Sequence, residues 1–136
     1  DNLLKKLQIF ELKDRKLSTL SGGEFQKVAL CAALAQDAEI ILLDESTAFL
    51  DLNYKLEFDE LLKNLTTTGK TIITVTHNIN DAVNLSKKIL ALKNGKQFYF
   101  GNAQNFFDTN IPQQIFDVNF SKIRLDDFNF LYIPRK

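Results

Sequence analysis

Residues 40–45 read Ile40-Ile41-Leu42-Leu43-Asp44-Glu45, a short unbroken apolar run that ends in two carboxylates. An apolar run of this length predicts a strand that is buried on both faces, as in a parallel sheet. In open α/β sheets, ligands bind beyond the carboxyl ends of such strands. Asp44 is therefore a candidate for holding Mg²⁺, directly or through water, and Glu45 for orienting or deprotonating an attacking water. The alternative is that both are solvated loop or helix-capping carboxylates.

A second buried strand is expected over 71–76, where β-branched residues follow one another. His77, the only histidine, comes directly after it. A histidine there can contact a terminal phosphate and position a water, whereas the alternative is an ordinary hydrogen-bonded loop histidine. Helices are expected over 53–65 and after His77, the latter with Asn78 or Asn80 near its cap. This alternation indicates an α/β sheet with right-handed crossovers.

The segment Leu20-Ser21-Gly22-Gly23-Glu24 stands at the start of another predicted helix, which is apolar on most sides and therefore expected to be well buried. Adjacent glycines at a helix start leave N–H groups uncovered, and helix N-termini attract anions. The segment is therefore a candidate anion site, to which Ser21 adds a hydroxyl donor. The alternative is a capping box, in which Ser21 and Glu24 satisfy each other's end groups.

The remaining chain supplies local signals but little chemistry. Asn94-Gly95 between apolar runs predicts a hairpin, a helix is expected over 103–108, and weak strand patterns occupy 116–123 and 130–133. A short helix is expected at the beginning of the chain, followed by a polar connector over 13–20. Asp51 is a candidate N-cap of the 53–65 helix. Cys31, the only cysteine, is best explained by core packing.

Composition limits the classes of function. The 136 residues are 45% hydrophobic, and 17 basic residues balance 17 acidic ones. A strongly basic surface for nucleic acid is therefore not indicated. Neither a secretory signal nor a transmembrane helix is expected from the apolar runs. The chain contains no methionine, so we expect Asp1 to lie inside a longer protein.

Taken together and in this order, the segments 20–24, 40–45, 47–51 and 76–77 resemble the second half of an ABC-type nucleotide-binding domain. The resemblance covers about residues 13–101. It implies an α/β fold that is part of the P-loop NTPase (ABC ATPase) fold, with a mostly parallel sheet flanked by helices and without the Walker A part. We expect residues 1–20 to end a helical subdomain, 21–101 to form the C-terminal half of the ATPase core, and 102–136 to be a C-terminal extension.

The resemblance also implies a role for each motif. Ser21, Gly22, Gly23 and Glu24 match the signature motif, which contacts the γ-phosphate of ATP held by the opposite subunit. Asp51 matches the aspartate of the D-loop, which couples the two sites of a dimer.

Three further residues are matched to the catalytic machinery of the family. Asp44 matches the Walker B aspartate that holds Mg²⁺ with ATP, Glu45 the catalytic glutamate, and His77 the switch histidine. The implied partners are ATP, a second nucleotide-binding subunit and transmembrane permease subunits, at the cytoplasmic face of the cell membrane.

The sequence departs from the family in several places, of which the change at Phe25-Gln26-Lys27 after the signature is mild. Ser46 replaces a usual proline and Phe49 a usually small residue, which changes the backbone freedom of the D-loop. The 136 residues contain no Gly-x-x-x-x-Gly-Lys-Ser/Thr, the loop that cradles ATP phosphates. We therefore expect this chain alone neither to bind ATP tightly nor to hydrolyse it, and its sheet to expose an edge.

The tail after Gly101 and the segment before Ser21 are similar to importers of iron–siderophore, haem or cobalamin complexes. This favours an ATPase subunit that couples ATP hydrolysis to import of an iron-chelate type of cargo. One alternative is a soluble ABC ATPase acting on DNA or ribosomes, for which a salt-sensitive gel shift would be evidence. The other is a non-catalytic interaction module, in which Glu45 and His77 would be replaceable.

Overall fold

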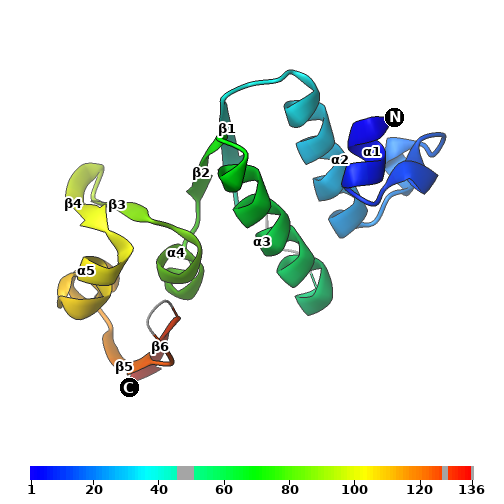
Figure 1. Ribbon diagram of the computed structural model, residues 1–136. Helices are drawn as coiled ribbons and strands as arrows, with labels where there is room; N and C mark the ends of the chain where they lie inside the picture. The colour runs from blue at the N-terminus through cyan, green and yellow to red at the C-terminus, as the bar shows by residue number, and fades with distance from the viewer. Residues whose placement is uncertain (46–50, 127–128, 136) are drawn as a thin grey trace. The chain divides into compact units, whose positions relative to one another are not determined.

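The computed structural model describes residues 1–45, 51–126 and 129–135. These residues form two compact units, unit 1 over Asp1–Val75 and unit 2 over Thr76–Lys136 (Figure 1). None of the helices in the described part of the chain is long and apolar enough to cross a membrane. The expected division at residues 20 and 101 stays a prediction.

The described part of unit 1 contains three α-helices, two 3-10 helices and one parallel strand pair. Its elements are α1 (Asn2–Lys6), η1 (Phe10–Leu12), η2 (Leu17–Thr19), α2 (Gly22–Ala35), β1 (Ile40–Asp44), α3 (Leu52–Thr67) and β2 (Thr71–Val75). The β1 and β2 strands are parallel, with Ile40 opposite Thr71 and Asp44 opposite Val75. The predicted helix over 53–65 is confirmed as α3, which connects the two strands.

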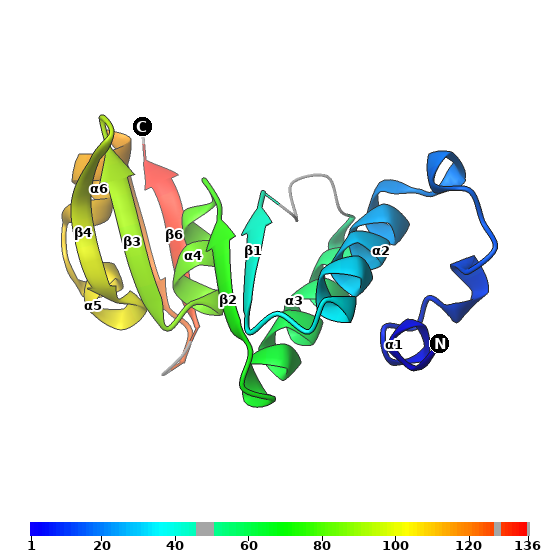
Figure 2. The ribbon, with the colours of Figure 1, turned by 90° about the horizontal axis from the view of Figure 1, so that it is seen from above.

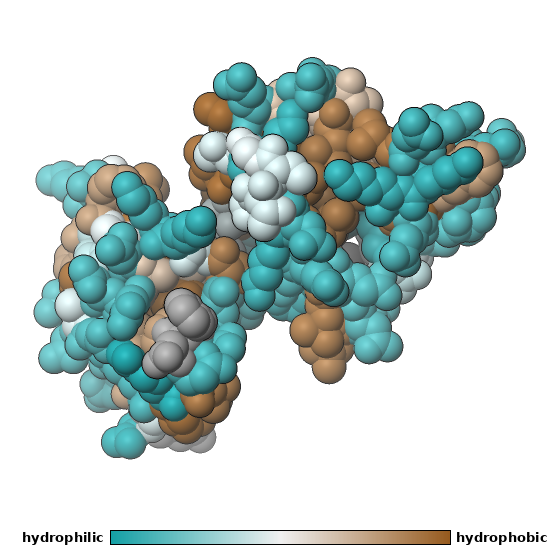
Figure 3. All heavy atoms as spheres, viewed as in Figure 1, coloured by the Kyte–Doolittle hydropathy of each residue, from teal (hydrophilic) through white to brown (hydrophobic). Residues whose placement is uncertain are grey.

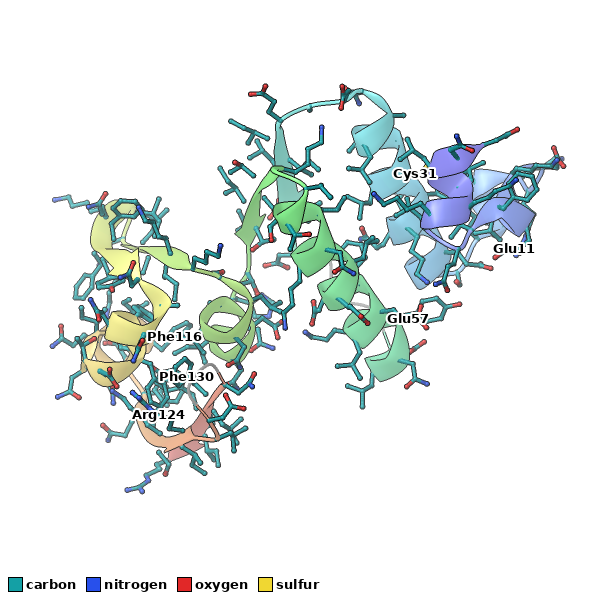
Figure 4. The ribbon with its side chains drawn as sticks, in the orientation of Figure 1. Glu11, Cys31, Glu57, Phe116, Arg124 and Phe130 are labelled. Carbon is teal, nitrogen blue, oxygen red and sulfur yellow. The ribbon has the colours of Figure 1, made fainter. Side chains whose placement is uncertain are left out.

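The core of unit 1 lies between the helices and one face of the strand pair. Figure 2 shows α2 and α3 on the same side of β1 and β2. Cys31, labelled on α2 in Figure 4, is buried there, and burial raises the pKa of its thiol, as expected of a packing residue. The core residues are Leu7, Ile9, Leu12, Leu30, Cys31, Leu34, Ile41, Phe58, Leu62 and Leu65.

The prediction that both strands are buried on two faces is wrong for the described structure. Ile41 is 3% exposed, whereas Leu42 is 73% exposed. Neighbouring residues of a strand point to opposite faces, and only the Ile41 face meets the helices. The other face of β1 and β2 carries exposed apolar side chains, and Figure 3 shows apolar atoms at the surface beside these strands. This outer face consists of Ile40, Leu42, Ile73 and Val75.

The expected burial of the helix after Ser21 is also corrected. Only one stripe of α2 is buried, formed by Lys27, Leu30, Cys31 and Leu34. Phe25 on another side is 48% exposed. The apolar residues of α2 lie on more than one side of the helix, but α1, α3 and β1 cover only one side. A helix packed in this way buries only the residues of one face.

Unit 2 combines short helices with two antiparallel hairpins. Its elements are α4 (Ile79–Leu85), β3 (Lys88–Lys93), β4 (Lys96–Asn102), α5 (Ala103–Asp108), α6 (Ile111–Phe116), β5 (Asn119–Arg124) and β6 (Phe130–Arg135). The predicted hairpin is confirmed, with Asn94 and Gly95 both at positive φ, 52° and 71°. The helix expected over 103–108 is confirmed as α5.

Two expectations for the strands need correction. Phe116 ends α6 and does not start a strand, because Pro112 in the first turn favours a helix there. The expected mostly parallel sheet is present only as β1 and β2, since the other two strand pairs of the described chain are antiparallel. The α/β class itself is confirmed. Unit 2 packs around Val83, Ile89, Ala103, Phe106, Phe107, Phe130 and Tyr132.

Candidate functional site

The start of α2 is a complete capping box. The backbone N–H of Ser21 donates to Oε2 of Glu24 at 2.8 Å, and the N–H of Glu24 donates to Oγ of Ser21 at 3.3 Å. The capping box, which was the alternative to an anion site in this segment, is therefore present. It does not exclude anion binding, because the Ser21 hydroxyl accepts in this bond and keeps its own proton to donate.

Glu24 is held as a carboxylate by its surroundings. The hydrogen bonds from the backbone and side chain of Ser21 lower the pKa of Glu24, and Arg15 adds to the effect. Nη1 of Arg15 lies 3.0 Å from Oε1 of Glu24. The arginine offsets the negative charge that Glu24 brings to the helix N-terminus, which would otherwise repel a phosphate.

Gly23 is needed for packing. A Cβ atom at this position would lie 2.9 Å from two ring atoms of Tyr54 on α3, closer than van der Waals contact allows. Lys27 lies over the ring of Tyr54, with its Nζ 5.0 Å from the ring centroid. The same Nζ forms an ion pair with Oε2 of Glu57 at 2.6 Å. Figure 4 labels Glu57 on α3. The first turns of α2 therefore pack against the first turns of α3 and are joined to them by an ion pair.

Sequence reasoning missed this connection. Lys27 is only 9% exposed, although a lysine in a helix suggests a solvated position. Tyr54 belongs to the predicted 53–65 helix, whose sequence pattern does not indicate a contact with Gly23 or Lys27. An available signal was the glycine at 23, since a glycine inside a helix often permits close approach of another element.

Asp51 is the N-cap of α3. Its Oδ1 accepts a hydrogen bond of 3.0 Å from the N–H of Tyr54. The capping role expected for Asp51 is confirmed, and it places this carboxylate at the end of α3 that touches the start of α2. Ser46 and Phe49, the two departures in the D-loop, lie outside the described residues.

Asp44 and Glu45 stand at the carboxyl end of β1, as predicted. Asp44 is the last residue of the strand, and both side chains are exposed. The N–H of Glu45 donates to the carbonyl of Val75 at the end of β2, at 3.0 Å. Glu45 has a φ of 44°, in the left-handed region that residues other than glycine seldom adopt. Such backbone strain is typical of functional positions and turns the chain sharply after the strand.

The donor set is compatible with Mg²⁺ that is bound together with a nucleotide. Mg²⁺ prefers oxygen ligands and is usually held by one or two carboxylates, waters and substrate phosphates. Asp44 offers an accessible carboxylate of this kind. In the described ranges, no group of three or more His, Cys, Asp or Glu residues is placed to hold a metal by itself.

His77 belongs to unit 2 and lies in a tightly bonded turn. Oγ1 of Thr76 accepts from the N–H of Asn78 at 3.0 Å. Oδ1 of Asn78 in turn accepts from the N–H groups of Asn80 and Asp81, at 3.0 and 3.3 Å, and caps α4. Of the two candidates for this cap, Asn78 is the residue used. His77 is therefore held between two side chains that bond to the backbone.

Comparison with known proteins identifies the family. A family model described as "ABC transporter" matches residues 1–48. The energy-coupling factor transporter ATP-binding protein EcfA1 of Fusobacterium nucleatum is 42% identical over 79% of this chain and 40% of its own length. The iron(3+)-hydroxamate import ATP-binding protein FhuC of Bacillus subtilis is 38% identical over 85% of this chain and 44% of its own length.

Solved structures are similar over most of the chain. A transporter described as of the metal-chelate type, in an inward-facing conformation, has a TM-score of 0.87 at 26% identity, over 99% of this chain and 55% of that one. CbiO1 of Clostridium perfringens has a TM-score of 0.72 at 31% identity, over 84% of this chain and 46% of that one. These neighbours confirm the P-loop NTPase type of α/β fold.

The chain spans less than half the length of the curated relatives named above. Within that span, the ordered motifs, the family model and the solved structures agree. The chain belongs to the family of ABC transporter ATP-binding domains.

Proposed function

We propose that the protein carrying these residues is the ATP-hydrolysing subunit of an ABC importer. The observation that carries the proposal is the carboxylate pair at the end of β1, where Glu45 holds a left-handed backbone and bonds to the end of β2. This is the edge of an α/β sheet at which ligands bind. The relatives whose names include import of iron(3+)-hydroxamate and petrobactin support an iron-chelate type of cargo.

Each residue of the catalytic group has a distinct task in this proposal. Asp44 would hold Mg²⁺, which supplies charge neutralisation at the ATP phosphates. Glu45 orients the attacking water and accepts one of its protons as the oxygen bonds to the γ-phosphorus. His77 contacts the terminal phosphate and stabilises the charge that it carries. The bond to the β-phosphate oxygen breaks, and ADP and phosphate leave.

The signature segment serves the ATP of a second subunit. The hydroxyl of Ser21 and the N–H groups at the start of α2 point their positive ends toward the γ-phosphate. Gly23 keeps that helix end close to Tyr54, and Asp51 caps the helix that carries Tyr54. These contacts join Asp51, the last residue of the D-loop, to the signature segment through the first turn of α3.

The 136 residues alone are proposed to be inactive. They contain no phosphate-binding loop with its lysine, so the β- and γ-phosphates lack their main cradle. In the full-length protein we propose a dimer of two such subunits that works with permease subunits at the cytoplasmic face of the membrane. ATP binding closes the dimer and hydrolysis reopens it.

The test traps this dimer. Glu45→Gln in the full-length protein removes proton acceptance but keeps the shape of the side chain, so an ATP-bound dimer should accumulate with Mg²⁺ and ATP. Sedimentation together with retained radiolabelled nucleotide measures it. Glu39→Gln, an exposed carboxylate just before β1, is the control and should behave as wild type. Equal dimer and nucleotide for both variants would refute the proposed role of Glu45.

A further inference from the structure

Two asparagines of α4 bind the outer edge of β6. Nδ2 of Asn80 donates to the carbonyl of Tyr132 at 3.2 Å, and Oδ1 of Asn80 accepts from the N–H of Tyr132 at 2.7 Å. Asn84 makes the same pair of bonds with Phe130, at 2.9 and 2.8 Å. Each primary amide thereby takes the place that a peptide group of a neighbouring strand would occupy.

The spacing of helix and strand explains why this pairing occurs twice. Four residues of an α-helix advance about 6 Å, and two residues of a strand advance about 6.7 Å. Asn80 and Asn84 are four apart on one face of α4, while Tyr132 and Phe130 are two apart along one edge of β6. Pro134, the next residue at this edge, has no N–H to satisfy.

The bound strand is firmly seated in the core of unit 2. Phe130 and Tyr132 are 4% and 2% exposed. The ring of Phe107 lies 4.5 Å from that of Phe130 and 5.2 Å from that of Tyr132, between centroids. Figure 4 shows Phe130 among other aromatic side chains of this unit. β6 is therefore held in place by the core of unit 2, and α4 is hydrogen-bonded to it.

The helix held in this way is the one that follows His77. Asn80 uses its backbone N–H to bond Oδ1 of Asn78, and its side chain to bond Tyr132. Only Asn78 and Ile79 separate Asn80 from His77. A displacement of β6 from α4 would therefore act directly on the turn that holds the histidine.

We propose that Asn80 and Asn84 are positioning residues for His77, and that the β5–β6 hairpin sets the geometry of the histidine through them. The proposal rests on the proposed function, in which His77 contacts the terminal phosphate. It makes the C-terminal part of the chain a component of the catalytic apparatus, although it supplies no reacting group.

The first test follows His77 directly in the 136-residue chain, where the only histidine gives a single set of imidazole NMR signals. Asn80→Ala should accelerate hydrogen exchange at the N–H of Tyr132 by about tenfold or more, and should shift or broaden the signals of His77. Asn84→Ala should do the same at Phe130 with a smaller change at His77. Asn64→Ala, an exposed helical asparagine in α3, should change neither.

The same spectra contain the contradicting result. Faster exchange at Tyr132 with His77 signals unchanged in position and width would overturn the proposal. If Asn80→Ala unfolds unit 2, Asn80→Asp takes its place, because it keeps the acceptor for the N–H of Tyr132 and removes only the donor. Unchanged His77 signals in a folded Asn80→Asp chain, which lacks the bond from the side chain of residue 80 to the carbonyl of Tyr132, would be equally contradictory.

The second test measures ATP hydrolysis by the full-length protein. Asn80→Ala should lower kcat by about tenfold and leave KM within about twofold, because a misplaced histidine weakens the transition state more than nucleotide binding. An unchanged kcat would overturn the positioning role. The NMR experiment needs no ATP, so failure of the dimer trap with Glu45→Gln and failure of this inference give different results.

Discussion

The two units differ in how they treat the part of a strand that its partner strand does not cover. The comparison is between the outer face of β1 and β2 and the outer edge of β6. The edge of β6 is closed by the amides of Asn80 and Asn84, and its inward residues are buried. The outer face of β1 carries Leu42 at 73% exposure, next to Ile73 at 50%. Unit 2 therefore provides hydrogen-bond partners for the outer edge of its C-terminal strand, whereas unit 1 covers only one face of its strand pair.

The largest expected effect is a difference in stability loss between a substitution in β6 and one in β1. Phe130→Ala should destabilise unit 2 by about 3–5 kcal/mol, because it empties a packed aromatic site. Leu42→Ala should change stability by no more than about 0.5 kcal/mol, because its side chain is mostly in water. Urea denaturation of the 136-residue chain, followed by amide NMR signals of each unit, measures both. Equal losses for the two variants would contradict the description of the outer face.

The next effect concerns the contact between α2 and α3. Gly23→Ala should destabilise unit 1 by about 1–3 kcal/mol, because the added methyl group overlaps the ring of Tyr54. The double variant Gly23→Ala/Tyr54→Ala should lose less than the sum of the two single losses. Thermal and urea unfolding supply the four free energies of this cycle, and strict additivity would count against the contact.

A third effect appears at alkaline pH. Burial raises the pKa of Tyr132 above its ordinary value of 10.0. The unfolded chain then releases this proton first, so the stability is fully present below about pH 10 and is lost as pH rises above it. Tyr132→Phe should remove this part of the alkaline loss. Unfolding free energies between pH 9 and 11 test this, and identical pH slopes for both chains would contradict it.

The smallest effect lies at acidic pH, at the start of α2. The hydrogen bonds from Ser21 lower the pKa of Glu24, so its contribution is present above the unfolded pKa and is lost as pH falls through the folded value. Glu24→Gln should reduce the acid dependence of unit 1 only slightly, since the pair with Arg15 is partly exposed. NMR titration of the Glu24 carboxyl gives the direction directly, and a pKa above 4.5 would be inconsistent with the capping box.

Local patterns in the sequence predicted most of what local interactions decide. Ser21 and Glu24 lie three residues apart, and Asn94-Gly95 is adjacent, so the capping box and the hairpin turn follow from short-range chemistry. The order of motifs also predicted the fold family. The roles of Asp44, Glu45 and His77 stay predictions until the experiments above are done.

The interactions that sequence analysis missed join distant parts of the chain. Asn80 and Asn84 bind residues that are 52 and 46 positions away, and an asparagine in a short helix has no pattern that indicates such a partner. The exposure of Leu42 was missed for a related reason. An apolar run shows what a strand can bury, but the burial itself depends on which other elements are present to cover it.

The most direct test of the central claim is the rate of phosphate release by the full-length protein with Mg²⁺ and ATP. Wild type is expected to release phosphate continuously, and Glu45→Gln is expected to lower the rate by about a hundredfold or more, because the proton acceptor is lost. Glu39→Gln should retain the wild-type rate. Wild-type turnover by Glu45→Gln would contradict the assignment of the catalytic carboxylate at the end of β1.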